Sequence, residues 1–87
     1  ADVKISAQCN RVPVTEGHVA CVSVKLKKKA SVDAVIQAWR SFKSVPQKLQ
    51  LPSAPENPIY YFDQENYPQP RLHRHLDKGM AVSIGRL

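Results

Sequence analysis

Several features that define common protein classes are scarce or missing in this sequence. Its 87 residues contain two cysteines and three glycines, and no apolar run reaches the length of a transmembrane helix. Two cysteines are too few for a disulfide framework, and no secretory signal opens the chain. No G-x-G-x-x-G pattern occurs, so the glycine loop of a dinucleotide-binding domain is absent. We therefore expect a reduced, cytoplasmic protein without a membrane partner or a cofactor-binding residue of its own.

The composition is otherwise that of a globular domain with excess positive charge. Hydrophobic residues make up 43% of the chain, which excludes disorder throughout, and the net charge is +6. The charge is concentrated in Lys25 to Lys29 and Arg71 to Arg74, which is typical either of a nucleic-acid surface or of solvated segments. Tyr60 and Tyr61 are adjacent, so at most one can stack bases on a given strand face. We expect no nucleic-acid partner, with a small basic nucleic-acid-binding module as the alternative.

The first quarter of the chain predicts a β-hairpin. Val3 to Val12 and Val19 to Leu26 are rich in β-branched residues and approximately alternate. With a four-position turn around Thr15-Glu16, Arg11 and His18 point to one face as diagonal neighbours, about 7 Å apart. A cation and an imidazole at the rim of an apolar face indicate a substrate site.

The rest of the chain predicts one helix and two short strands. Ser31 is a suitable N-cap, and apolar residues follow at helical spacing: Val32, Val35, Ile36, Trp39 and Phe42. Val45 to Pro58 and Asp63 to Lys78 are expected to be irregular, while Ile59 to Phe62 and Met80 to Leu87 are predicted strands. This order predicts an α+β fold: a mostly antiparallel sheet with one principal helix packed on one face.

Several segments resemble one enzyme family. Gln8-Cys-Asn-Arg-Val-Pro-Val-Thr-Glu-Gly-His-Val-Ala-Cys21 is similar to the substrate-site hairpin of aspartate-semialdehyde dehydrogenases of the fungal and archaeal form. The similarity continues to the end of the chain through Ala38–Phe42, Leu51–Pro55, Pro68–Leu72, Gly79–Ser83 and Gly85–Leu87. It implies that residues 1–87 are a fragment of the catalytic and dimerisation domain. A start at Ala1 rather than Met, and a strand-like end, agree with that expectation.

The resemblance also implies an activity. Such an enzyme uses NADPH to interconvert L-aspartyl 4-phosphate with L-aspartate 4-semialdehyde and phosphate, in lysine, methionine and threonine biosynthesis. His18 would be the acid/base catalyst and Arg11 would bind the small-molecule substrate's carboxylate. NADP would bind to parts of the parent homo-oligomer, a dimer or tetramer, that lie outside this chain. Alone, the chain is expected to be inactive, or to act as a structural dimerisation module.

Arg11 and His18 both have simpler interpretations. A histidine beside a turn is more often structural or exposed, and an arginine on a strand can reach solvent or pair with Glu16. Cys9 resembles a thiolate nucleophile activated by its positive neighbours. In the family, however, the nucleophile belongs to a different motif with no counterpart here, so we expect Cys9 to pack as a small hydrophobe.

The segment around Arg74 is the least like the family. His73 and His75 form half of a possible metal site, but no Cys, Asp or Glu cluster with zinc-site spacing accompanies them, and Asp77 alone does not complete one. We therefore expect no metal. The resemblance implies acidic residues on both sides of this arginine, and histidines occupy those positions instead. The role of this loop is left open.

Overall fold

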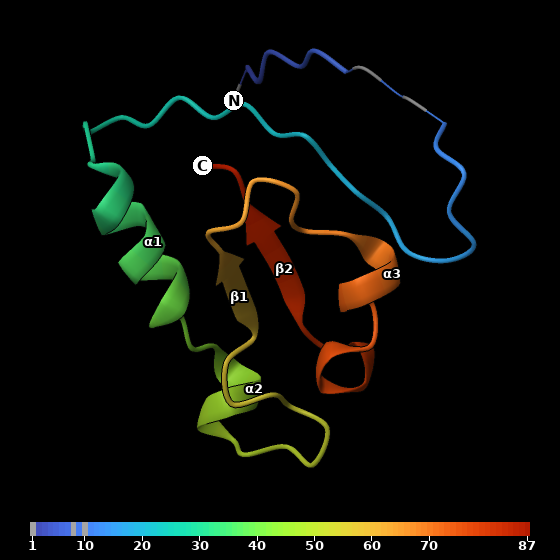
Figure 1. The fold of residues 1–87 in the computed structure, drawn as a ribbon. Coiled ribbons are helices and arrows are strands. Elements are labelled where there is room, and N and C mark those ends of the chain that lie inside the picture. Colours follow the sequence, from blue (N-terminus) through green and yellow to red (C-terminus); the bar gives the residue numbers. More distant parts are fainter. Residues whose placement is uncertain (1, 8, 10) are drawn as a thin grey trace.

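The computed structural model describes residues 2–7, 9 and 11–87. Figure 1 shows a long irregular segment that sweeps around a small unit of helices and strands. The elements of that unit are α1 (Val32–Arg40), α2 (Val45–Lys48), β1 (Ile59–Phe62), α3 (Pro70–His73), the 3-10 helix η1 (Leu76–Gly79) and β2 (Val82–Gly85). Within the described part of the chain, no helix has the length and apolar character needed to cross a membrane.

The predicted helix is confirmed as α1. Its start is set by Ser31, whose Oγ accepts a hydrogen bond of 3.1 Å from the backbone N–H of Ala34. Its end is set by Ser41, whose hydroxyl donates to the carbonyl of Gln37 at 2.8 Å. Phe42 lies beyond the last helical residue and is 46% exposed, so the apolar stripe is shorter than the sequence predicted.

The core is small and lies between α1 and β1. Ile36 is the one buried hydrophobic residue among the described positions, with 9% of its surface exposed. Trp39, one turn later, is half-buried and stacks on Tyr61 of β1 with ring centroids 5.8 Å apart. Two side chains on one face of α1 therefore anchor it against the sheet.

The strands at Ile59 and Val82 are confirmed, but the predicted mostly antiparallel sheet is wrong. Within the described residues the sheet has two strands, and β1 and β2 run parallel from the pair Ile59 and Val82 to the pair Phe62 and Gly85. Parallel strands need a crossover of about a dozen residues or more. The segment between the strands is long enough to return to the same end of the sheet, and it contains α3 and η1.

The two segments expected to be irregular contain short helices. α2 begins at Val45 with Pro46 in its first turn, and the N–H of Ser44 donates to Oε1 of Gln47 at 2.9 Å. α3 begins directly at Pro70. Proline is favoured in the first helical turn, where its missing N–H would have no partner within the helix. These prolines therefore start helices in two segments that the sequence analysis expected to be irregular.

Several contacts hold the crossover to the sheet. Tyr60 on β1 donates its hydroxyl to Oδ2 of Asp77 in η1 at 2.8 Å. That hydrogen bond raises the pKa of Tyr60 above its ordinary value, with smaller contributions from burial and from the negative charges of Asp77 and Glu56. At the other end, a Cβ placed on Gly85 would lie 2.6 Å from the carbonyl oxygen of Tyr67, so only glycine fits there.

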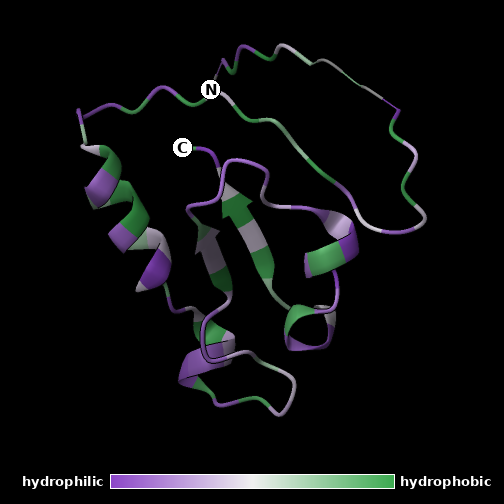
Figure 2. Ribbon diagram, viewed as in Figure 1, coloured by the Kyte–Doolittle hydropathy of each residue, from purple (hydrophilic) through white to green (hydrophobic). Residues whose placement is uncertain are grey.

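The predicted hairpin is also wrong: neither Val3 to Val12 nor Val19 to Leu26 forms a strand among the described residues. Residues 8 and 10, which fall in the first predicted strand, lie outside that description. Figure 2 shows hydrophobic residues along this segment, and the large ones are at least 43% exposed: Val3, Ile5, Val12, Val14, Val19, Val22, Val24 and Leu26. The alternation of apolar and polar residues selects a face for burial, but it supplies no third strand or helix to cover that face. A hairpin on its own is only marginally stable in water.

Candidate functional site

Arg11 and His18 lie on the irregular segment, on either side of a bend at Thr15 and Glu16. Both side chains are exposed. A short turn precedes the bend, in which the N–H of Val14 donates to the carbonyl of Val12 at 2.9 Å. Because the described residues form no hairpin here, the strand register that placed Arg11 and His18 on one face does not hold in this structure. Their roles remain predictions.

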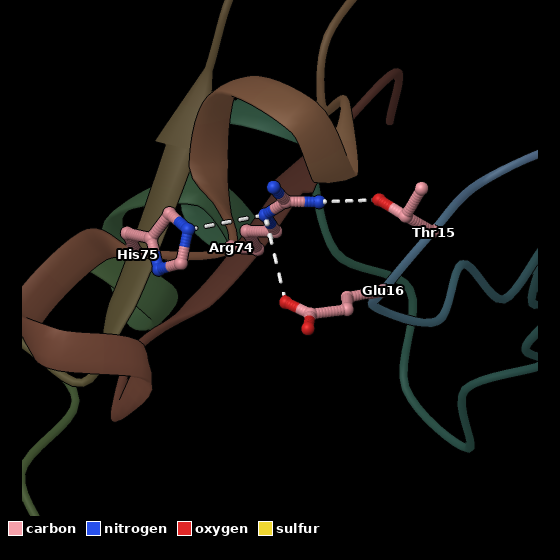
Figure 3. Close-up of polar contacts among 4 residues, drawn as sticks. All are labelled: Thr15, Glu16, Arg74 and His75. Carbon is pink, nitrogen blue, oxygen red and sulfur yellow. Dashed lines mark hydrogen bonds and ion pairs between the residues drawn. The ribbon is translucent and has the colours of Figure 1, made fainter.

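The bend is held against α3. Nη1 of Arg74 donates to Oγ1 of Thr15 at 3.0 Å, and Nε of Arg74 lies 4.0 Å from a carboxylate oxygen of Glu16 (Figure 3). Gly17 has a φ of +97°, and a Cβ added to it would lie 3.1 Å from Cβ of Pro70 at the start of α3. The residue immediately before His18 is thus in close contact with the helical unit. Glu16, considered above as a partner for Arg11, pairs with Arg74 instead.

The two histidines beside Arg74 have separate structural roles. His73 packs between Phe62 and Tyr67, with ring centroids 4.4 and 4.6 Å away, and its Nδ1 accepts from the backbone N–H of Gln69 at 2.9 Å. His75 accepts at Nε2 from Nε of Arg74 at 3.1 Å. In residues 2–7, 9 and 11–87, no three His, Cys, Asp or Glu side chains gather as potential metal ligands.

The cysteines do not pack as expected. Cys9 and Cys21 are both free thiols, and both are exposed. The prediction that Cys9 is a small buried hydrophobe is therefore wrong in this structure, because its segment packs against no sheet.

The depression beside β1 does not suit a dinucleotide. The turn that follows β1 carries Asp63 and Glu65, which line a shallow depression with Arg86. A pyrophosphate would be repelled by these carboxylates, and the tight glycine turn that lets a backbone approach phosphate is missing.

Arg74 and Thr15 were missed as a pair by the sequence analysis. Arg74 was considered as part of a basic stretch and as the residue between His73 and His75, and Thr15 only as a turn residue. The two residues are separated by 59 positions. No local pattern in the sequence signals a contact over that separation.

Comparison with known proteins gives one consistent result. Residues 1–87 match the family model described as semialdehyde dehydrogenase, dimerisation domain. The chain is 48% identical over 87 residues to an aspartate-semialdehyde dehydrogenase of Methanothermobacter thermautotrophicus, covering 100% of the chain and 25% of that protein. It is 44% identical over 89 residues to the protein of that name from Candida albicans (100% of the chain, 24% of the relative). It is 48% identical over 89 residues to the protein of that name from Schizosaccharomyces pombe (99% of the chain, 25% of the relative).

The chain thus spans about a quarter of the length of the curated relatives it matches. The resemblance noted from the substrate-site segment and the whole-chain match agree with each other. The chain belongs to the semialdehyde dehydrogenase dimerisation-domain family.

Proposed function

We propose that residues 1–87 are part of the catalytic and dimerisation domain of an aspartate-semialdehyde dehydrogenase. The reaction is the interconversion of L-aspartyl 4-phosphate with L-aspartate 4-semialdehyde and phosphate, in lysine, methionine and threonine biosynthesis. The observation that carries this proposal is the match of the whole chain to the family and to relatives of that name at 44% identity or more. The activity belongs to a longer protein that contains this segment, called the full-length protein below.

Arg11 and His18 divide the work on the substrate. The guanidinium of Arg11 offers two parallel N–H donors that suit the amino-acid carboxylate, so the substrate is held at one end. The imidazole of His18 serves as acid/base catalyst at the other end, because an imidazole can both accept and donate a proton. Their positions on either side of one short bend, with both side chains exposed, support access by a single small molecule.

The other components lie outside these residues. As the family resemblance implies, NADP would be bound elsewhere in the full-length protein, and the nucleophilic thiol would also be located elsewhere; the sequence lacks the glycine-rich dinucleotide loop. The family's description as a dimerisation domain supports a homo-oligomer, either a dimer or a tetramer. We place the protein in the cytoplasm, where unpaired cysteines such as Cys9 and Cys21 stay reduced.

The nucleic-acid alternative is not favoured. The comparisons favour the enzyme, and two of the groups that would contact nucleic acid, Arg74 and Tyr61, have other partners in the structure. Arg74 bonds to Thr15, and the ring of Tyr61 stacks on Trp39. No second function is proposed.

Steady-state kinetics of the full-length protein test the proposal. We expect His18→Asn to lower kcat by about 10²- to 10⁴-fold, which is the usual contribution of a general acid/base. Arg11→Lys is expected to raise the KM for the semialdehyde by about tenfold or more, because lysine lacks the bidentate fork. Cys9→Ser, the control, should retain activity.

Two outcomes would count against the assignment. Full activity in His18→Asn would remove the acid/base role, and an unchanged KM in Arg11→Lys would remove the carboxylate contact. Dehydrogenase activity in the isolated 87-residue chain would show that the cofactor and the nucleophile are not elsewhere.

A further inference from the structure

Within the described residues, Arg74 is the one polar link between the bend and the helical unit. Among the described residues before Ser31, side-chain hydrogen bonds and ion pairs to the rest of the chain are made only by Thr15 and Glu16, and both go to Arg74. Figure 3 shows the guanidinium between these two residues and His75. The contacts join parts of the chain that are 59 positions apart.

The backbone beneath Arg74 is fixed. Its N–H donates to the carbonyl of Pro70 at 2.9 Å at the end of α3. His73, one residue earlier, is held by Phe62 and Tyr67, so the helix end is anchored to the aromatic side of β1. The guanidinium therefore extends from a fixed base toward a segment that has no secondary structure of its own.

Arginine is suited to this position because its donors point in several directions at once. Nε donates to His75 at 3.1 Å, which sets the plane of the guanidinium. Nη1 is then directed at Thr15 at 3.0 Å. The exposed pair with Glu16, at 4.0 Å, adds little by itself. Lysine, a single ammonium, cannot hold both Thr15 and His75 in a fixed plane.

We propose that Arg74 is a positioning residue that holds the bend at Thr15 and thereby fixes Arg11 and His18 relative to one another. The inference rests on the proposed function, since it assigns the two residues on either side of the bend to the substrate. Gly17 supports the proposal, because it places the residue next to His18 directly against α3. A Cβ on Gly17 would lie 3.1 Å from Cβ of Pro70, which leaves little room for any larger side chain. A reaction that depends on orientation loses rate when a group is displaced by as little as 1 Å, by up to about 10²-fold.

Matched variants of the full-length protein separate positioning from general stability. Thr15→Val keeps the shape of the side chain and removes its hydroxyl, whereas Thr15→Ser keeps the hydroxyl. Arg74→Gln removes the charge and the fork, whereas Arg71→Gln removes the same charge from an exposed residue of α3. Three readouts apply: kcat/KM for the semialdehyde, the thermal midpoint, and amide hydrogen exchange in peptides that cover residues 11–18.

We expect Thr15→Val and Arg74→Gln each to lower kcat/KM about tenfold, and the double variant to be no worse than the poorer single one, since one contact is removed. Exchange in residues 11–18 should become faster, with the KM for NADP and the thermal midpoint unchanged. Thr15→Ser and Arg71→Gln should behave as the parent protein does.

Additive losses, equal behaviour of Thr15→Val and Thr15→Ser, or unchanged exchange in Arg74→Gln would overturn the inference. The proposed function fails separately, if His18→Asn retains full activity. In that case, amide hydrogen exchange in residues 11–18 alone decides whether Arg74 holds the bend. Unchanged exchange in Arg74→Gln would then reject the positioning role.

Discussion

Ile36→Ala tests the packing that fixes the fold. The substitution removes three carbon atoms from the one buried hydrophobic side chain among the described residues. At about 0.8 kcal/mol per methylene the transfer loss is about 2.4 kcal/mol, and an unfilled cavity raises it toward 4 kcal/mol. The free energy of unfolding should therefore fall by about 2–4 kcal/mol.

The assay is urea unfolding of the full-length protein, followed by circular dichroism, with Val32→Ala as control. Val32 lies on the same helix but is 54% exposed, so its replacement should change the free energy of unfolding by no more than about 0.5 kcal/mol. If the two variants lose similar stability, Ile36 does not face the sheet and the packing of α1 described here is incorrect.

Two other substitutions test contacts of the crossover. Gly85→Ala should cost about 1–3 kcal/mol in urea unfolding, because its Cβ would meet the carbonyl of Tyr67 at 2.6 Å; an unchanged midpoint would contradict this contact. Asp77→Asn should lower the pKa of Tyr60 toward its ordinary value, measured by the ultraviolet absorbance of tyrosinate, and identical titration curves would argue against the bond. Because the pKa of Tyr60 is raised in the folded protein, the stability that its hydrogen bond to Asp77 contributes is complete below about pH 10. It is lost as the pH rises through the pKa of Tyr60 in the folded state.

Local signals in the sequence were sufficient for α1 and for the positions of both strands. Ser31 caps α1 through a hydrogen bond three residues away, and the apolar spacing that orients it is equally local. The aromatic run from Ile59 to Phe62 likewise identifies a strand.

Strand direction and the site contacts depend on interactions that are distant in sequence. Whether β1 and β2 run parallel is decided by the path of the crossover, and short strands of four residues carry no mark of direction. Pro46 and Pro70 indicate a break or a helix start equally well, and only capping contacts such as that of Gln47 decide between them. The contact of Arg74 with Thr15 has no local counterpart at all.

The hairpin error has a different cause. Val3 to Val12 and Val19 to Leu26 have strand-forming composition, but composition alone does not create a partner strand. As a consequence, the region from Arg11 to His18 is positioned by its contact with α3, whereas the sequence analysis relied on strand register.

The most direct test of the account is a crystal structure of the full-length protein with L-aspartate bound as a substrate-sized ligand. We expect the guanidinium of Arg11 to lie about 3 Å from the carboxylate at the amino-acid end, with the imidazole of His18 facing the other carboxyl group. A ligand bound elsewhere, or Arg11 and His18 facing opposite sides of the chain, would contradict the proposed site.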